Sequence, residues 1–246
     1  MRYYAMGPIA VKKKSDLSPV TAADLAADLY IRERLEKLDP TLPMISEEAD
    51  PALNLRCLAA PTVWIVDPLD GTSGFANRSK HGEFAVSIGL LHNLVPEIGV
   101  IYLPVKGQLF FAKRGLGAYA QHKGEKVRSI SCTQSKELAL LVNRSLQIPE
   151  KFKRDPLTKN IPIQRMSAAG KFGVLAEGLA NIYVRNGPTS EWDTAAGHCI
   201  VEAAGGKVLD FQGNPLLYGK PGFQNPPFLA FAPGAKDWRL ILDLLL

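Results

Sequence analysis

The residues best suited to chemistry lie in one short stretch, 64–75, where two carboxylates follow a run of apolar residues. Residues 62–66 are mostly β-branched or aromatic, which predicts a buried strand. Asp67 ends this strand, and Pro68 is expected to turn the chain because proline cannot continue the hydrogen-bonded ladder. Asp70 then brings a second carboxylate back beside the first. Two neighbouring carboxylates repel each other unless a cation lies between them, and oxygen-only ligands favour Mg²⁺.

Gly71 and Thr72 follow the second carboxylate. Glycine lets a ligand approach the backbone closely, and free backbone amides at a turn or a helix start can bind an anion. The stretch therefore indicates a metal next to a phosphate. The alternative is two ordinary turns in succession, one Asp-Pro and one Asp-Gly, with no ligand at all.

Three further carboxylates stand at the ends of expected elements: Asp24 at a helix start, Glu47 in an acidic pair after a short apolar segment, and Asp193 before a helix. Each has an ordinary explanation, a helix cap for the two aspartates and a solvated loop for the glutamate. Glu47 and Asp193, taken with the first two aspartates, form the set that a two-metal phosphatase needs, in which bridging carboxylates hold cations roughly 3.5–4 Å apart. No Cys-x5-Arg motif or Ser/His pair offers a covalent nucleophile, so water is the expected attacker.

The bulk composition is that of a globular protein. The chain has 246 residues, of which 46% are hydrophobic and 22% charged, enough for one large domain or two modest ones. A net charge of +5 fits a small anionic substrate. A nucleic-acid polymer is not expected, because no basic run is denser than 12–14 and no aromatic residues alternate with basic ones.

The cysteines, the apolar stretches and the start of the chain predict where in the cell the protein is found. Cys57, Cys132 and Cys199 form no C-x-x-C motif, which predicts reduced thiols. No apolar stretch is long enough to cross a membrane, and the start lacks a signal peptide. We therefore expect a cytoplasmic protein; the sequence does not predict its oligomeric state.

The first half is expected to combine a helix with an antiparallel sheet. After a loop over residues 1–20, a helix opens at 21–24 and ends before Pro40, with an apolar stripe at Leu25, Leu29, Leu35 and Leu38. Residues 49–61 should form a loop or short helical link. Strands are predicted at 84–91, 97–103 and 108–112, and because their connections are too short for helices they should be antiparallel. Residues 115–119 continue this meander. The polar stretch 77–83 is either a flap beside an anion site or an exposed turn.

The second half is expected to begin after a polar linker over 121–137. We place a domain boundary near Ser135, which gives two units, 1–135 and 136–246. The second unit should contain, in order, a strand at 138–142, a surface excursion at 149–162, a helix at 167–180, a strand at 182–184, a helix of small residues at 194–204, strands at 207–209 and 227–232, and a closing helix at 235–246. The mixture predicts an α+β or layered α/β fold.

Three motifs together resemble the lithium-sensitive, Mg²⁺-dependent inositol monophosphatase superfamily: S-E-E at 46–48, D-P-L-D-G-T at 67–72 and W-D-T-A-A-G at 192–197. Stretches 14–24, 82–84 and 187–193 are most similar to bacterial 3′(2′),5′-bisphosphate nucleotidases of the CysQ type. Those enzymes remove the 3′-phosphate of adenosine 3′,5′-bisphosphate, a by-product of sulfate assimilation. The resemblance spans nearly the whole chain. It implies a layered α-β-α-β-α sandwich whose first half carries most metal ligands and whose second half completes the substrate pocket.

The resemblance also implies roles for individual residues. Two or three Mg²⁺ ions would be held by Glu47, Asp67, Asp70 and Asp193 and by the backbone carbonyl of Leu69. Catalysis would involve Thr72, which orients the attacking water, Asp24, which supports Thr72, and Glu47, which shares in accepting the water's proton. The substrate would be bound by the backbone amides of Gly71 and Thr72, which cradle the phosphate, and by Ser167, Lys171 and Arg185, which fall where related nucleotidases contact the nucleotide.

The sequence departs from the family pattern at a few places. Residues 1–4 match only the last turn of a longer first helix, which leaves open whether Met1 is the true start. Ser73-Gly74 replaces a charged pair, and residues 143–146 lack a histidine, so the choice among nucleotide substrates is open. Alternative functions are the same chemistry on inositol phosphates or fructose 1,6-bisphosphate, or a non-catalytic nucleotide-binding regulator. The intact carboxylates argue against the regulator.

Overall fold

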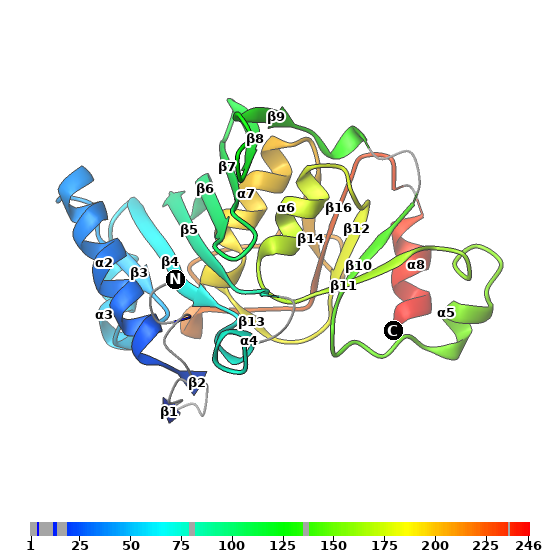
Figure 1. Ribbon diagram of the computed structural model, residues 1–246, viewed down its shortest axis with the longest axis horizontal. Coiled ribbons are helices and arrows are strands. Elements are labelled where there is room, and N and C mark those ends of the chain that lie inside the picture. Colours follow the sequence, from blue (N-terminus) through cyan, green and yellow to red (C-terminus); the bar gives the residue numbers. More distant parts are fainter. Residues whose placement is uncertain (1–3, 5–11, 14–18, 79–81, 135–137, 236) are drawn as a thin grey trace.

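The helices and strands stack in five layers, helix, sheet, helix, sheet, helix (Figure 1). The computed structural model describes residue 4 and residues 12–13, 19–78, 82–134, 138–235 and 237–246. The predicted α-β-α-β-α sandwich is confirmed. The inner faces of both sheets pack on the central helices. The outer helices cover the second sheet and the side of the first sheet formed by β3 (Met44–Ser46) and β4 (Thr62–Asp70). The later strands of the first sheet bury mainly alternate residues.

The first sheet has seven strands in the order β3-β4-β5-β6-β7-β8-β9. β3 (Met44–Ser46) runs parallel to β4 (Thr62–Asp70), and the neighbours after β4 are antiparallel. The others are β5 (Ala85–His92), β6 (Val95–Leu103), β7 (Gln108–Lys113), β8 (Gly117–His122) and β9 (Arg128–Ile130). The predicted meander is confirmed. β9 lies in the stretch predicted as a linker, because pairing with β8 overrides its polar composition.

β4 passes through Pro68 instead of ending at Asp67, so the predicted turn at the proline is wrong. Its pairing with β5 is interrupted between Asp67 and Asp70, where the register shifts. A bulge of this kind accommodates a proline, because the missing N–H falls where no ladder bond is made. The interruption also changes the path of the chain between the two carboxylates, Asp67 and Asp70.

The outer helix layer is made by α2 (Ala22–Leu38) and α3 (Pro51–Cys57), which lie beside β3 and β4. Thr21 caps α2, and its side chain and that of Asp24 form a capping box, as the sequence predicted. The predicted leucine stripe is wrong for three of its four members, because Leu25, Leu29 and Leu38 are 55%, 59% and 72% exposed, whereas Leu35 packs against the core as predicted. α2 instead turns Ala23, Asp24 and Ile31 inward, where Asp24 accepts a hydrogen bond from Thr72 of α4 (Thr72–Ala76) and Ile31 packs against Trp64 and Val66 of β4.

The second sheet has five strands in the order β11-β10-β12-β16-β14. They are β10 (Leu140–Asn143), β11 (Ile163–Met166), β12 (Ile182–Arg185), β14 (Lys207–Asp210) and β16 (Phe228–Phe231). β10 is parallel to β11 and β12, so the carboxyl ends of these three strands share one edge. The sequence did not predict β11, whose exposed Gln164 hides the strand pattern.

The central layer consists of α6 (Gly170–Ala176) and α7 (Ala195–Ala203), which lie between the two sheets (Figure 1). Phe172 of α6 and Ile200 of α7 join one core with Phe110 of the first sheet and Phe228 of the second. The predicted helix 167–180 is shorter than expected, since residues 167–169 form a turn before α6. The small residues of α7 allow it to lie close to the first sheet.

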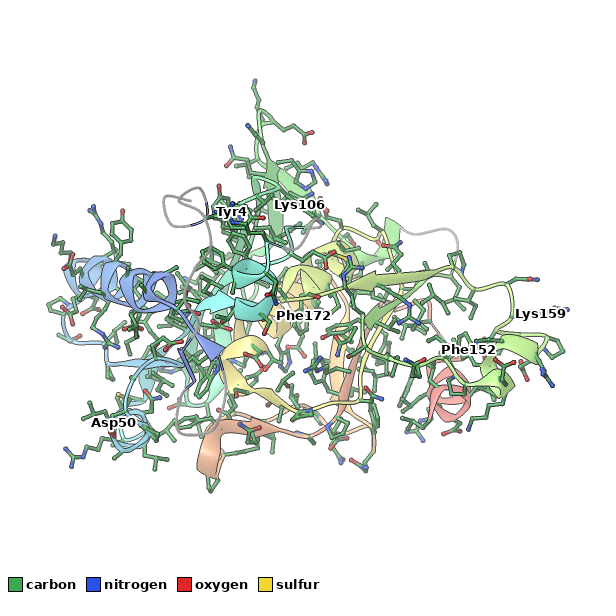
Figure 2. All side chains as sticks on the ribbon, turned by 60° about the horizontal axis from the view of Figure 1, so that its bottom comes forward. Tyr4, Asp50, Lys106, Phe152, Lys159 and Phe172 are labelled. Carbon is green, nitrogen blue, oxygen red and sulfur yellow. The ribbon has the colours of Figure 1, made fainter. Side chains whose placement is uncertain are left out.

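The last layer is made by α8 (Trp238–Leu245) and α5 (Glu150–Arg154), which pack on the outer face of the second sheet. Figure 2 shows Phe152 of α5 beside α8, and its side chain is fully buried there. The stretch 149–162 was predicted as a plain surface excursion. One aromatic residue anchors a helical turn within it.

Short elements complete the described chain. They are the paired strands β1 (Lys12–Lys13) and β2 (Pro19–Val20), in place of part of the predicted loop, the pair β13 (Thr189–Ser190) and β15 (Gln224–Asn225), the helix α4 (Thr72–Ala76), and the 3-10 turns η1 (Cys132–Gln134), η2 (Glu191–Asp193) and η3 (Pro221–Phe223). The predicted domain boundary near Ser135, the stub at Met1 and residues 79–81 of the predicted flap lie outside the described residues. Among the helices that the structure describes, none has the length and apolar character needed to cross a membrane.

Candidate active site

Glu47 is positioned by the end of β3 and by a buried asparagine. Its backbone N–H donates to the carbonyl of Val66 on β4, 3.1 Å away. The side chain of Asn54, on α3, bonds both backbone groups of Ser46, with N–O distances of 3.1 and 2.8 Å. Because Ser46 pairs with Val66 in the parallel register, the next residues along the chain, Glu47 just after β3 and Asp67 within β4, lie side by side. Asn54 was not anticipated, since nothing in the sequence distinguishes it from a loop residue.

Asp193 reaches the same place from the second half of the chain. It lies in η2, where Ser190 N–H donates to its Oδ2 at 2.8 Å in a capping box. Ser87 of β5 donates to the carbonyl of Trp192 at 3.0 Å and ties this turn to the first sheet. One carboxylate oxygen from each of Glu47, Asp67 and Asp193 lies within 4.8 Å of the others. Three of the four predicted metal carboxylates therefore meet in one cluster.

Asp70 lies at the side of this cluster that faces the second half. Its Oδ2 accepts a hydrogen bond from the backbone N–H of Ala169, in the turn before α6. It lines a pocket together with Asp193, Lys171 and Arg185. Two carboxylates and two cations thus line the same pocket.

The carboxylates strongly perturb one another's ionisation. Burial raises the pKa of Asp67 well above its ordinary value, and the negative charges of Glu47, Asp70 and Asp193 raise it further. Burial likewise raises the pKa of Asp193 to about 8 and that of Asp70 to about 6. So many buried anions are stable together only with compensating positive charge, and a set of oxygen donors alone fits a hard divalent cation such as Mg²⁺.

Thr72 and Asp24 form a hydrogen-bonded pair beside the cluster. The Thr72 hydroxyl lies 2.9 Å from Asp24 Oδ1 and 3.2 Å from the carbonyl oxygen of Leu69, and it can donate to either. The other oxygen of Asp24 accepts from the backbone N–H of Thr21 at 2.8 Å. Asp24 therefore caps its helix and holds Thr72 at the same time, so the two interpretations of this residue are compatible.

Gly71 precedes α4 in a left-handed conformation, with φ +93°. A side chain here would be strained by that φ, and a Cβ would lie 2.9 Å from the carbonyl oxygen of Glu83. Only glycine fits this position without distortion. It keeps the backbone after Asp70 bare, as a close ligand approach requires.

The three residues predicted to contact the nucleotide differ in burial and in hydrogen-bond partners. Lys171 is only 3% exposed, and its Nζ donates to the carbonyls of Ala168 and Met166 at 2.8 and 3.3 Å. Burial lowers its pKa to about 8. Arg185 donates to the carbonyl of Pro188 at 2.7 Å, while its Nε is buried with no hydrogen-bond partner in the part of the chain that the structure describes. Ser167 is half-buried, and its backbone N–H donates to Glu83.

Comparisons with known proteins identify the family and the fold. The model of the inositol monophosphatase family matches residues 2–237. A 3′(2′),5′-bisphosphate nucleotidase CysQ of Salmonella typhimurium is 39% identical over 227 residues, which cover 92% of this chain and 90% of that protein. The crystal structure of CysQ from Bacteroides thetaiotaomicron is 36% identical, has a TM-score of 0.73, and covers 89% of this chain and 86% of that one. An IMPase/NADP phosphatase solved with Mg²⁺ and phosphate shares the fold at 19% identity and a TM-score of 0.75, covering 96% of this chain and 85% of that one.

Proposed function

Because this chain belongs to the inositol monophosphatase family, we propose that it is a Mg²⁺-dependent phosphatase that removes the 3′-phosphate of adenosine 3′,5′-bisphosphate. The observation that carries the proposal is the meeting of Glu47, Asp67 and Asp193 beside a pocket that contains Lys171 and Arg185. Such a pocket can take a substrate with one phosphate at the carboxylates and further negative charge nearby. We include 3′-phosphoadenylyl sulfate, which carries the same 3′-phosphate, as a second substrate. A cytoplasmic location stays a prediction.

The metal would be held by the four carboxylates, Glu47, Asp67, Asp70 and Asp193, and by the carbonyl of Leu69. When bound, Mg²⁺ supplies a Lewis acid that stabilises the negative charge on the attacking and leaving oxygens. The number of ions stays at two or three in the proposal. The chain itself must orient the water, accept its proton and bind the substrate.

Thr72 is proposed to orient the attacking water. While its hydroxyl donates to Asp24, the oxygen keeps a lone pair that can accept a hydrogen bond from water. Glu47 would share in accepting the proton that water loses on attack. The bare amides of Gly71 and Thr72 would bind the phosphate oxygens, which gain charge in the transition state.

The direct test is phosphate release from adenosine 3′,5′-bisphosphate, inositol 1-phosphate and fructose 1,6-bisphosphate, measured side by side with Mg²⁺. We expect the nucleotide to give the highest kcat/KM, excess chelator to stop the reaction, and Li⁺ and Ca²⁺ to inhibit it. Preference for either of the other two esters would assign the chain to that activity instead. Full activity in chelator would reject the metal mechanism, and no release from any ester would favour the non-catalytic regulator.

Thr72→Val is expected to lower kcat by about a hundredfold, with little change in KM for the nucleotide. Valine has nearly the same shape but cannot hydrogen-bond water or Asp24. Asp24→Asn should have a smaller effect, because the amide oxygen can still accept from Thr72. Steady-state kinetics of the two variants, with thermal unfolding to check the fold, measure this. An unchanged kcat in Thr72→Val would remove Thr72 from the mechanism.

Lys171→Met and Arg185→Gln are each expected to weaken use of adenosine 3′,5′-bisphosphate by about ten- to a hundredfold. A charge-assisted contact to phosphate contributes roughly 1.5–3 kcal/mol, and these cations line the pocket beside the carboxylates. The hydrolysis of adenosine 3′-monophosphate, which lacks the 5′-phosphate, should change little in either variant. The exposed Lys159→Met serves as a control for charge alone. Equal losses on both substrates would instead place the two cations at the metals or the scissile phosphate.

A further inference from the structure

Glu83 is a buried carboxylate for which neither the sequence nor the proposed mechanism accounts. It lies just before β5, in the stretch predicted as a flap or an exposed turn, yet it is only 5% exposed. Arg144 holds it with two parallel hydrogen bonds, from Nε to Oε2 at 2.8 Å and from Nη2 to Oε1 at 2.6 Å. The backbone N–H of Ser167 donates to the same Oε2 at 2.9 Å. A carboxylate that precedes a strand of the first sheet thus accepts hydrogen bonds from two residues that follow strands of the second sheet.

Arg144 is itself fixed in place. It follows β10, and the guanidinium of Arg165 on β11 donates from Nη1 to the carbonyls of Arg144 and Leu146 at 3.1 and 2.7 Å. The loop that carries Arg144 is therefore tied to its own sheet. A bidentate Arg–carboxylate pair is strong and directional, so it can fix the distance between the two sheets at this point.

The residues that Glu83 contacts lead directly to the active site. Ser167 opens the turn 167–169, in which Ala168 has a left-handed φ of +58° and Ala169 donates its N–H to Asp70. A non-glycine residue is strained in that conformation, so the turn needs external support. The backbone of Glu83 also lies against Gly71: a Cβ at Gly71 would be 2.9 Å from Glu83 O and 3.5 Å from the Cβ of Ala168. Glu83 therefore contacts Gly71, the neighbour of Asp70, and also Ser167, which precedes the pocket-lining residues Ala168 and Ala169.

We propose that Glu83 is a positioning residue. Bound by Arg144, it holds the turn 167–169 against Asp70 and Gly71. The ion pair, joined to the strained turn through Ser167, keeps Asp70 in place for the metal and fixes the wall of the substrate pocket. This inference rests on the proposed function of the site only for its kinetic consequences. Its structural consequence, the ordering of the turn, does not depend on which phosphate ester is hydrolysed.

The kinetic test uses Glu83→Gln and Arg144→Met. Glutamine keeps the size of the side chain and an oxygen for Ser167 N–H, but it loses the charge that binds the guanidinium. We expect the Mg²⁺ concentration for half-maximal activity and the KM for the nucleotide each to rise about tenfold, with a smaller change in kcat. Glu83→Asp should retain part of the ion pair, so its Mg²⁺ requirement and its KM should lie between those of Glu83→Gln and the wild type. Arg114→Met, which breaks the ion pairs of Arg114 with Glu202 of α7 and with Glu97 of β6, is the matched control and should leave these values unchanged.

Two measurements without substrate separate this proposal from the proposed function. Amide hydrogen exchange in a peptide covering residues 163–172 should become about tenfold faster in Glu83→Gln and in Arg144→Met, with little change in peptides from β6 or β7. Mn²⁺ titrated alone by calorimetry should bind about tenfold more weakly to both variants. The double variant should show the same exchange rate and Mn²⁺ affinity as the more strongly affected single variant, because all three proteins lose the same ion pair.

Unchanged exchange and unchanged Mn²⁺ affinity in both variants would overturn the inference. So would a lower melting temperature with no selective effect on residues 163–172, because that result means general support of the fold. If the wild type hydrolyses none of the three esters, the proposed function fails, and the exchange and Mn²⁺ results still decide the role of Glu83.

Discussion

Asp67→Asn is expected to lower kcat/KM by at least about a thousandfold, which corresponds to about 4 kcal/mol of transition-state stabilisation. Asp67 is the most enclosed member of the carboxylate cluster, and one of its oxygens lies within 4.8 Å of carboxylate oxygens of Glu47 and Asp193. Asparagine has the same shape, and its oxygen can still accept the N–H of Leu69, which donates to Asp67 at 2.9 Å. The substitution removes a charge needed to hold metal while leaving the backbone where it is.

The fold of Asp67→Asn should be intact or slightly more stable without metal. Burial and three neighbouring carboxylates raise the pKa of Asp67, so its charged form destabilises the metal-free protein. Thermal unfolding in chelator, next to kinetics in Mg²⁺, measures both effects. The exposed Asp243→Asn, which lies on α8 away from the site, is the matched control. Activity close to that of the wild type would show that Asp67 binds no catalytic metal.

Gly99→Ala is expected to cost about 3 kcal/mol of folding free energy, or roughly 10 °C in melting temperature. Gly99 lies in β6, where a Cβ would be only 2.2 Å from the carbonyl oxygen of Ala196 in α7. The clash is with backbone, so it can be relieved only if the helix moves away from the sheet. Because α7 begins two residues after Asp193, that movement also displaces a metal carboxylate, and kcat/KM should fall with stability.

Gly234→Ala provides the control, since a Cβ there meets nothing within 4 Å and the residue has no positive φ. It should melt at the temperature of the wild type and keep full activity. A Gly99→Ala protein that melts like the wild type would mean that α7 is free to shift on the sheet. The close approach of helix and strand would then not fix the site.

The features that the sequence predicts well are set by neighbours along the chain. The capping box of Thr21 and Asp24 spans three residues, and the strands of the meander follow from alternating apolar positions joined by short turns. The D-P-L-D-G-T segment likewise brings two of its own carboxylates to one place. Local spacing decides these features, so a single sequence contains enough information for them.

The features that were missed or wrong depend on contacts between distant segments. The exposed Leu25 and Leu29 follow a helical period as well as Ile31 does. Contacts with distant segments, the bond from Thr72 to Asp24 and the packing of Ile31 in the cluster of the first sheet, fix which face of α2 turns inward. Glu83 stands in a polar stretch and is buried because Arg144, 61 residues later, supplies its counter-charge. Asn54 becomes structural only when α3 docks against β3. No spacing rule relates these pairs, because the fold brings them together.

The late position of α7 in the sequence affects how the chain can fold while it is being synthesised. It comes from the second half of the sequence, yet it covers the inner face of the first sheet, where Ile101, Leu103 and Phe110 are buried. A growing chain that has just passed β9 therefore displays an apolar sheet face and three of the four carboxylates. At about 5–20 residues per second, several seconds pass on the ribosome before α7 is synthesised. During that interval the inner face of the first sheet has no cover, so the amino-terminal half depends on its surroundings to avoid aggregation, and the proposed metal site gains its fourth carboxylate, Asp193, only when the carboxyl-terminal half arrives.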